Sequence, residues 1–417
     1  MSVLRRNIFS LFILQGSNYF ITLLTLPYLT RVLGVEGFGV YSLTISIAQY
    51  FVIFIDFGFN LSASKRIAEH QDEPEYISRV FFETIYAKSI LCLISIACII
   101  IFASLNAYSV IRSELIYTII MLIGTVLMPI WFFQGIEKLS VVTKLMVFSR
   151  LALLPLFFMF VRSDADVKYA VLIQSSLSLL AGLIAIIYIY KQKIIKSVNF
   201  PSLKIAHTLK DSFPIFAAVL SNSLYTMSTT IIIGIFSNVY EVSMFTAADR
   251  MKGAILGVFL ILGNAFYPRI NALLVNHKDQ AYSLIRKIFY WQGALCILLI
   301  TFVVTFSKLI TQIMFGAEYS EVSELLILFS PVYFLVLQSA VLGNYILLTH
   351  GHKKAYTILP IASAIIHIPL CAYLASKYGA WGGIISVITA EAFTLILLIL
   401  ILKRKKLLFE VLYNKSN

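Results

Sequence analysis

The sequence predicts an all-α integral membrane protein of about twelve transmembrane helices, arranged as two six-helix bundles with both termini in the cytoplasm. Of the 417 residues, 60% are hydrophobic and 13% are charged. Soluble domains are roughly 45–50% apolar and about 25% charged. The chain therefore holds about 250 apolar residues, enough for roughly twelve helices of about 20 residues each. This composition excludes a soluble enzyme and a small domain held by one anchor.

Twelve apolar runs of spanning length follow one another along the chain. They lie at about residues 8–32, 38–61, 80–104, 114–135, 141–161, 167–190, 211–236, 243–270, 286–306, 325–348, 354–376 and 380–402. The first run is too long for a cleaved signal peptide and carries Gln15, Ser17 and Asn18 in its middle. We therefore expect it to be the first transmembrane helix.

The distribution of Lys and Arg predicts the orientation of these helices. If the N-terminus is cytoplasmic, 23 of the 33 basic residues lie in cytoplasmic segments and 6 in outside segments. A surplus of that size on one side is typical of the cytoplasmic side of a membrane protein. The net charge of +13 thus reflects topology, and we expect no nucleic-acid partner.

The longest polar segment, residues 191–210, joins the sixth apolar run to the seventh. Its basic and apolar residues interleave, so we expect an amphipathic cytoplasmic linker on the anionic inner leaflet. It divides the chain into an N-terminal bundle at 1–190 and a C-terminal bundle at 211–402. A basic cytoplasmic tail follows at 403–417.

The two halves show a weak internal repeat. An offset of 204 residues places Ser17-Asn18 on Ser221-Asn222, Val35 on Val239 and Tyr41-Ser42 on Phe245-Thr246. A half with an even number of spans returns to the same side of the membrane. Two such halves are therefore related as parallel repeats about an axis along the membrane normal.

Several motifs of enzymes and pumps are missing from the sequence. It has no G-x-x-x-x-G-K-[ST] phosphate loop, no H-E-x-x-H and no G-x-S-x-G. The four cysteines all lie inside apolar runs, which favours core packing over a disulfide framework or metal site. We therefore expect no catalytic residue, no metal and no cofactor, and a coupling ion, if one is used, of H⁺, Na⁺ or Cl⁻.

Polar side chains recur at helical spacing in the first two apolar runs. Gln15, Asn18 and Thr22 share one face of the first run, and Gln49 belongs to a similar stripe on the second. A polar stripe cannot face lipid, so it faces either a neighbouring helix or a water-filled cavity. We take these residues, with Asn222 from the repeat, as candidate polar residues of a cavity.

Basic residues inside the spans are the strongest candidates for function. Lys88 and Arg150 lie roughly 12 and 14 Å from the cytoplasmic face, and Arg250 and Lys252 roughly 10–13 Å from the outer face. Arg31 ends the first run near the outer surface. A charge at mid-membrane costs at least about 2.5–3.5 kcal/mol, so such residues face the protein interior or pair with an acid.

Four acidic residues are possible partners for these cations: Asp56, Glu83, Asp249 and Glu391. If every cation pairs with an acid, the charges serve only to link the helices of the interior through ion pairs. If the cations exceed their partners locally, they form a ladder for an anionic substrate. Any of the acids could instead bind a coupling cation or proton, Asp56 first among them.

Three segments resemble a known family. They are LPYLTRVLGVEGFGVY at 26–41, DFGF at 56–59 followed by ASKR at 63–66, and QGIEK at 134–138. Together with twelve spans, they resemble the Wzx-type O-antigen flippases of the MATE-like (multidrug/oligosaccharidyl-lipid/polysaccharide) transporter superfamily. The first segment is similar to the first helical hairpin of the polysaccharide branch.

The resemblance implies a fold, a substrate and partners. It implies a V-shaped pair of six-helix bundles with a cationic central cavity, working by alternating access. The substrate is then one oligosaccharide repeat unit on undecaprenyl pyrophosphate, moved from the cytoplasmic to the periplasmic leaflet of the bacterial inner membrane. The implied partners are membrane lipids and the polymerase and chain-length regulator of the same pathway.

Three other functions stay open from the sequence. A multidrug or cation exporter of the same superfamily would favour uncompensated carboxylates, whereas buried basic residues are at least as numerous here. A lipid II flippase usually has two further helices. A polysaccharide polymerase or ligase, which is an enzyme, typically carries a large periplasmic loop that the sequence lacks.

Overall fold

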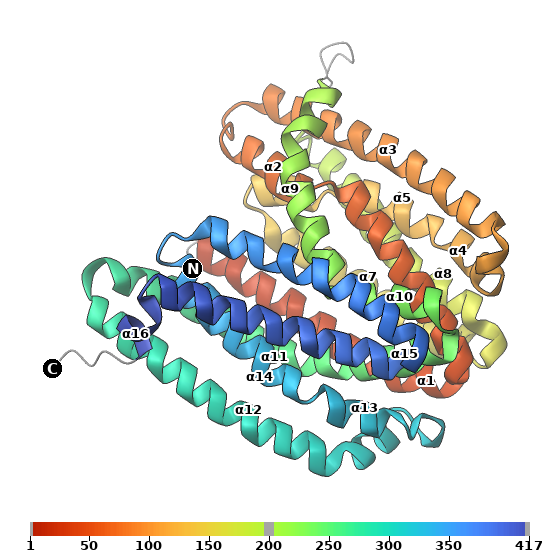
Figure 1. The fold of residues 1–417 in the computed structure, drawn as a ribbon. Helices are drawn as coiled ribbons and strands as arrows, with labels where there is room; N and C mark the ends of the chain where they lie inside the picture. Colours follow the sequence, from red (N-terminus) through yellow and green to blue (C-terminus); the bar gives the residue numbers. More distant parts are fainter. Residues whose placement is uncertain (1–2, 196–203, 413–417) are drawn as a thin grey trace. The chain divides into compact units, whose positions relative to one another are not determined.

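The computed structural model describes residues 3–195 and 204–412. The side chains of 3–15, 17–20, 22–23, 106–108, 260–262 and 264–265 are left out of the description. Every regular element in the described ranges is a helix, and no strand occurs there (Figure 1). The all-α prediction is therefore confirmed.

The chain divides into two compact units, Met1–Leu220 and Ser221–Asn417. The boundary falls inside helix α9, Ile205–Thr226. The predicted linker at 191–210 lies partly outside the described residues, so its place on a membrane surface stays a prediction. The exact limits of the two predicted bundles also stay predictions.

The first unit contains the elements up to the start of α9. They are α1 (Val3–Asp56), α2 (Phe59–Ala68), α3 (Pro74–Ser104), η1 (Asn106–Ile111), α4 (Arg112–Tyr117), α5 (Ile119–Leu127), α6 (Ile130–Gly135), α7 (Leu139–Phe160), η2 (Asp164–Asp166) and α8 (Val167–Lys191). Pro129 separates α5 from α6, and a proline cannot donate the backbone hydrogen bond that would continue the helix.

The second unit contains the elements after α9. They are α10 (Ser228–Phe236), α11 (Val239–Asn276), α12 (Lys278–Met314), η4 (Ala317–Tyr319), α13 (Val322–Phe329), α14 (Pro331–Ala340), the π-helix η5 (Val341–Leu348), α15 (Lys353–Arg404) and α16 (Leu407–Leu412). Helices α11 and α14 both pack against α15.

The two longest helices are each broken at a glycine. With 54 and 52 residues, α1 and α15 would be about 80 Å long if straight, far more than a hydrocarbon core of about 30 Å. Gly34 has φ 64° and Gly379 has φ 52°, a region that a side chain disfavours. Ser363 and Thr394 lie on opposite sides of the second break, and their hydroxyl oxygens are 2.6 Å apart. The halves of α15 therefore run back alongside each other (Figure 1).

Many of the helices are long and apolar enough to cross a membrane. Within the described residues, eight helices meet that condition, and α9 with α10 forms a ninth that is bent by 57°. Two of the eight contain the glycine breaks described above. The multi-helix membrane fold is thus confirmed, while the number twelve and the cytoplasmic placement of the termini stay predictions.

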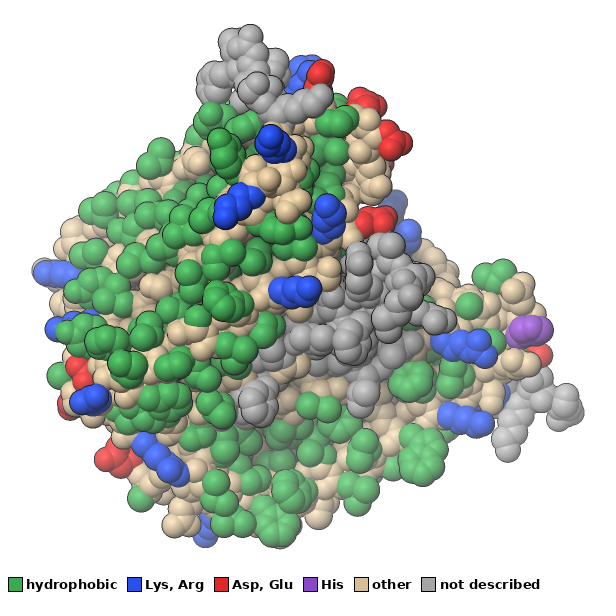
Figure 2. Space-filling model, turned by 180° about the vertical axis from the view of Figure 1, so that it is seen from behind, with side chains coloured by type: hydrophobic (Ala, Val, Ile, Leu, Met, Phe, Trp, Pro, Cys, Tyr) green, Lys and Arg blue, Asp and Glu red, His purple; other side chains and the backbone are tan. Residues whose placement is uncertain are grey.

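Apolar side chains are exposed along the candidate spans. Leu93 of α3 is 68% exposed and Leu298 of α12 is 67% exposed. Figure 2 shows hydrophobic side chains over much of one face, with few charged side chains between them. A soluble protein rarely exposes so much contiguous apolar surface, whereas a lipid-facing surface requires it.

Two aligned pairs of the internal repeat have similar surroundings in the two units. Val35 follows the break at Gly34, and Val239, its partner at an offset of 204, is the first residue of α11. Tyr41 and Phe245, the next aligned pair, are both buried. Helix starts and buried positions thus recur at the same offset.

Candidate functional site

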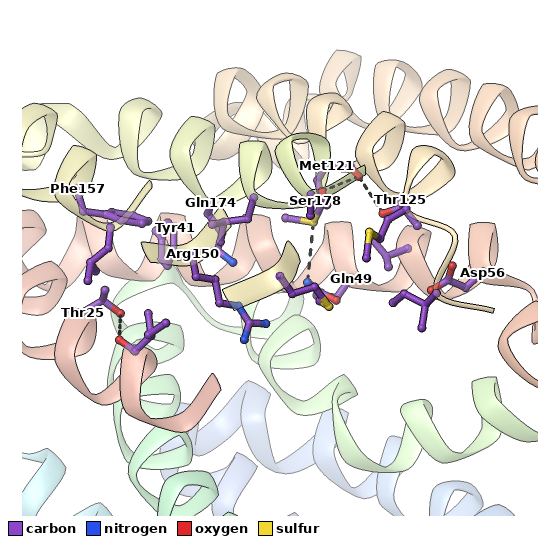
Figure 3. A pocket seen from close by; sticks show the side chains of 18 of the residues that line it. Thr25, Tyr41, Gln49, Asp56, Met121, Thr125, Arg150, Phe157, Gln174 and Ser178 are labelled. Atoms are coloured by element: carbon purple, nitrogen blue, oxygen red, sulfur yellow. Dashed lines mark hydrogen bonds between the residues drawn. The ribbon is translucent and has the colours of Figure 1, made fainter. Parts of the chain in front are cut away.

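A pocket of about 280 Å³ lies inside the first unit, among α1, α5, α7 and α8 (Figure 3). Most of its wall is apolar, which is usual for a small-molecule site. Its polar lining includes Gln49, Asp56, Thr125, Arg150, Gln174 and Ser178. These residues come from four helices that are far apart in sequence.

Glycines bring two walls of the pocket close together. A Cβ atom at Gly124 of α5 would overlap the backbone of Ser178 and Leu179 in α8, and one at Gly182 would lie 2.8 Å from the Leu127 side chain. Close backbone approach of this kind needs small residues. It fixes Ser178 beside α5, where its hydroxyl donates to the Met121 carbonyl at 3.2 Å.

Arg150 is the cation that lines this pocket. It sits in α7, and its Nη1 is buried without a hydrogen-bond partner among the described residues. Figure 3 shows the guanidinium pointing into the space between α1 and α7, on the same side as Gln49. A guanidinium has five N–H donors and stays charged. A buried donor without a partner is costly, and an anion or a polar ligand would supply an acceptor for this nitrogen.

Gln49 and Gln174 supply neutral polar groups in the same pocket. The Gln49 amide nitrogen donates to the sulfur of Met121 at 3.9 Å, a weak contact that a better acceptor would replace. Gln174 comes from α8, one helical turn before Ser178. Amides and hydroxyls of this kind can hydrogen-bond the hydroxyl groups of a sugar.

Lys88 does not line the pocket but lies directly behind it. Its side chain is 1% exposed, and its Nζ donates to Asp56 Oδ1 at 2.9 Å and to the Thr125 carbonyl at 2.6 Å. Asp56 is 30% exposed and lines the pocket. The charge of Lys88 is therefore compensated by a pocket acid.

Glu83 is the other candidate acid in the first unit, and its carboxylate accepts three hydrogen bonds. It accepts a hydrogen bond from Arg66 at 2.7 Å, from the Thr208 hydroxyl at 3.0 Å and from the Lys204 backbone N–H at 3.0 Å. These contacts tie α2, α3 and the start of α9 together. They lie apart from the pocket.

The charged candidates of the second unit lie on α11 and α15. Lys252 pairs with Asp249 at 2.5 Å and lies over the Phe329 ring, 4.7 Å from its centroid. Glu391 interacts electrostatically with Lys252. Arg250 is half-buried. The second unit thus brings one half-buried cation, Lys252, close enough to two acids to interact with both.

The remaining candidates are not brought to the pocket. Arg31 is exposed, three residues before the break at Gly34, and Asn222 is exposed on α9. The side chains of Gln15, Asn18 and Thr22 lie outside the described residues, so the polar stripe of the first run stays a prediction there.

Gln174 and Ser178 line the pocket but were not among the residues predicted from the sequence. Both lie in the sixth apolar run, four residues apart and hence on one helix face. That spacing was the available signal, since Gln is rare in a lipid-facing run. Among the described residues, no cluster of His, Cys, Asp and Glu could hold a metal ion.

Comparison with known proteins places this chain in a family. The model of the family described as "Polysaccharide biosynthesis protein" matches residues 4–274. A "Putative O-antigen transporter" of Escherichia coli (strain K12) is 32% identical over 413 residues, covering 97% of this chain and 98% of that protein. The chain belongs to the polysaccharide biosynthesis protein family. This family assignment, together with the O-antigen transporter relative, confirms the resemblance of the motifs to Wzx-type O-antigen flippases.

A more distant relative and two solved structures agree with this assignment. "Probable low-salt glycan biosynthesis flippase Agl15" of Haloferax volcanii is 24% identical, over 94% of this chain and 81% of that protein. "Lipid II flippase MurJ, inward closed conformation" has a TM-score of 0.73 at 15% identity, covering 96% of this chain and 88% of that one. An inward-facing MATE family transporter has a TM-score of 0.67 at 16% identity, covering 92% and 94%. These two likenesses confirm the fold.

The relatives also decide between transporter and enzyme. Those found by sequence are named as transporters or as a flippase. The prediction of a multi-pass membrane transporter is confirmed at that level, and the polymerase or ligase alternative loses its support. The substrate, the coupling ion and the protein partners stay predictions.

Proposed function

We propose that this protein is a flippase for lipid-linked oligosaccharides. Its substrate is one repeat unit of O-antigen or a related polysaccharide, carried on undecaprenyl pyrophosphate. The protein moves the repeat unit from the cytoplasmic to the periplasmic leaflet of the bacterial inner membrane by alternating access. The polymerase and chain-length regulator of the same pathway then act on the product.

The observation that carries this proposal is the environment of Arg150. A family of polysaccharide transporters needs a site for an anionic sugar headgroup, and Arg150 offers a buried guanidinium nitrogen without a partner among the described residues. Because Lys88 is already paired with Asp56, Arg150 supplies the uncompensated positive charge of the pocket. A cationic exporter substrate would be repelled by the same group.

The energetic reason for such a site is the cost of moving an anion through hydrocarbon. By Born estimates, the transfer of one small ion into a medium of low dielectric costs on the order of 20 kcal/mol. A fixed guanidinium offsets this cost through charge-assisted hydrogen bonds to phosphate or carboxylate oxygens. The lipid tail is apolar and needs no pocket, since it can stay in the bilayer.

The pocket also favours sugar over a flat apolar drug. Gln49, Gln174 and Ser178 place amide and hydroxyl groups around the space in front of Arg150 (Figure 3). At about 280 Å³ the pocket lies near the lower end of the usual size of ligand sites. It suits one sugar residue at a time rather than a whole repeat unit.

Deletion of the gene tests this function. In the strain of origin, we expect lipid-linked repeat units to accumulate on the cytoplasmic leaflet and surface polysaccharide to disappear. The measurement is the access of an impermeant oxidant or lectin to the sugars in right-side-out and inside-out vesicles. Intact surface polysaccharide with reduced efflux of a cationic dye would instead support the exporter.

A further inference from the structure

Two helix breaks of the first unit meet at one buried ammonium. The first break separates α1 from α2, where Phe57 and Gly58 both have positive φ, 41° and 75°. The second separates α5 from α6 at Met128 and Pro129. Lys88 of α3 reaches both breaks, because its Nζ bonds Asp56 at the first and Thr125 just before the second.

The bond to Thr125 has a specific cause. In an α-helix the carbonyl of residue 125 accepts from the N–H of residue 129, but Pro129 has no N–H. The preceding pair is intact, since Met128 N–H donates to the Gly124 carbonyl at 3.0 Å. Lys88 therefore satisfies the carbonyl that Pro129 leaves without its helical donor.

The bond to Asp56 fixes a carboxylate at the pocket wall. Asp56 is the last residue of α1, and the backbone turns sharply after it. Without a partner, this side chain at the end of a helix would be free to change rotamer. The ion pair with the Lys88 ammonium, which is 1% exposed, holds the Asp56 carboxylate in one position at the pocket wall.

The pocket consequently has a positive charge at one end and a carboxylate at the other. Arg150 and Asp56 lie well apart along its wall, with Gln49 between them (Figure 3). A sugar phosphate placed with its anionic group at Arg150 would direct hydroxyl groups toward Asp56, which can accept hydrogen bonds from them. The reversed orientation would bring phosphate against a carboxylate and be repelled.

We propose that Lys88 is a positioning residue for transport, which bridges the two helix breaks and so holds Asp56 as an acceptor for sugar hydroxyls. This inference rests on the proposed function, because it assumes a sugar headgroup in the pocket. Lys88 itself does not touch the substrate. Its role is exerted through Asp56 and through the end of α5.

The test is a set of variants in proteoliposomes with one lipid probe. The probe is undecaprenyl pyrophosphate carrying the fluorescently labelled repeat unit of the strain of origin. Flipping is the fraction that a membrane-impermeant reductant quenches with time. The variants are Lys88→Met, Asp56→Asn and their double mutant, with Lys65→Met as control. Lys65 is 74% exposed and lies outside the pocket.

Lys88→Met replaces the ammonium with a neutral side chain of similar length and leaves the half-buried Asp56 without its counter-charge. We therefore expect the rate of flipping to fall about tenfold or more. In the double mutant the neutral amide at position 56 needs no counter-charge, and flipping should return to the level of Asp56→Asn alone. Lys65→Met should flip like wild type.

The outcomes separate this inference from the function on which it rests. If wild type itself does not flip the probe, the proposed function fails. If wild type flips it and Lys88→Met does so equally, the positioning role is wrong. Independent, multiplicative losses in the double mutant would also overturn it, since they would mean that Lys88 does not act through Asp56. Gel filtration of each variant in detergent shows whether a loss reflects misfolding.

Discussion

Glu83 and Arg66 form a buried ion pair, with 2.7 Å between Glu83 Oε2 and Arg66 Nη2. Glu83 is 1% exposed and also holds the backbone N–H of Lys204 and the hydroxyl of Thr208. These contacts lie at one end of the first unit and join three helices. The carboxylate therefore has a structural use that explains its burial without a transported ion.

Glu83→Gln tests this assignment against the coupling-acid alternative. We expect a loss of about 1–3 kcal/mol in stability, because the amide weakens charge-assisted bonds from Arg66 and the Lys204 backbone. The measurement is the thermal midpoint in detergent, with the exposed Glu73→Gln as control. Flipping per folded molecule should be unchanged. A normally folded variant that has lost transport would contradict the structural role.

Gly124 tests the close approach of α5 and α8. In Gly124→Val the side chain would overlap the backbone around Ser178, so the two helices must separate. Overpacking of this kind typically costs about 1–3 kcal/mol, and more where backbone must move. We expect a lower yield of folded protein and a lower thermal midpoint. Gly253→Ala, with nothing within 4 Å of its Cβ position, is the control and should behave like wild type.

Glu241 stabilises the break in α15. Its carboxylate accepts the Ala380 backbone N–H at 2.7 Å, directly after Gly379, which has φ 52°. Glu241→Ala leaves this N–H without an acceptor and should cost about 0.5–2 kcal/mol, as for the loss of a helix cap. Hydrogen exchange read by mass spectrometry should become faster around residue 380 and stay unchanged in α12. Equal protection in the variant would contradict the cap.

A polar cluster of the second unit predicts a dependence of stability on pH. The Tyr282 hydroxyl donates to Glu410 Oε1 at 3.0 Å and lies 3.2 Å from His350 Nε2, and Lys278 pairs with Glu410. Burial lowers the pKa of His350 below its usual 6.5. Hydrogen bonds from Lys278 and Tyr282 lower the pKa of Glu410 below its usual range.

Both pKa shifts make the folded protein less stable in acid, but they act over different pH ranges. The unfolded chain protonates His350 near pH 6.5 while the folded chain resists, so stability is lost as the pH falls below about 6.5. The pKa of Glu410 is lowered in the folded chain, so its contribution to stability is lost only as the pH falls below the ordinary value of about 4.5. Between pH 7.5 and 5.5 we expect the thermal midpoint to fall less in His350→Gln than in wild type. An equal fall in both would show that His350 is not the titrating group.

The membrane fold could be predicted from composition and hydropathy, because the bilayer restricts a spanning chain to apolar helices. The same patterns placed the breaks near Gly34 and Gly379, where one apolar run ends and the next begins. They could not show that the backbone turns at a single glycine in each case, with φ 64° at Gly34 and 52° at Gly379. That detail depends on glycine φ, which hydropathy does not report.

The candidate site was only partly accessible from sequence. Depth in the membrane correctly singled out Lys88 and Arg150 as interior residues, but depth cannot distinguish a paired cation from an unpaired one. That distinction depends on Asp56 lying 32 positions before Lys88 yet 2.9 Å from its ammonium. Gln174 was missed because its four-residue spacing from Ser178 predicts a shared helix face but does not reveal that α8 lines a pocket together with α7.

The most direct test of the account is the flipping of a lipid-linked oligosaccharide by wild type and by Arg150→Gln in the same proteoliposomes. Lys144→Gln, an exposed lysine of the same helix, is the matched control. We predict that wild type and Lys144→Gln expose the undecaprenyl-pyrophosphate-linked probe of the inner leaflet to the quencher, and that Arg150→Gln does so at least about tenfold more slowly. Equal rates in a folded Arg150→Gln variant would contradict the claim that Arg150 binds the anionic headgroup.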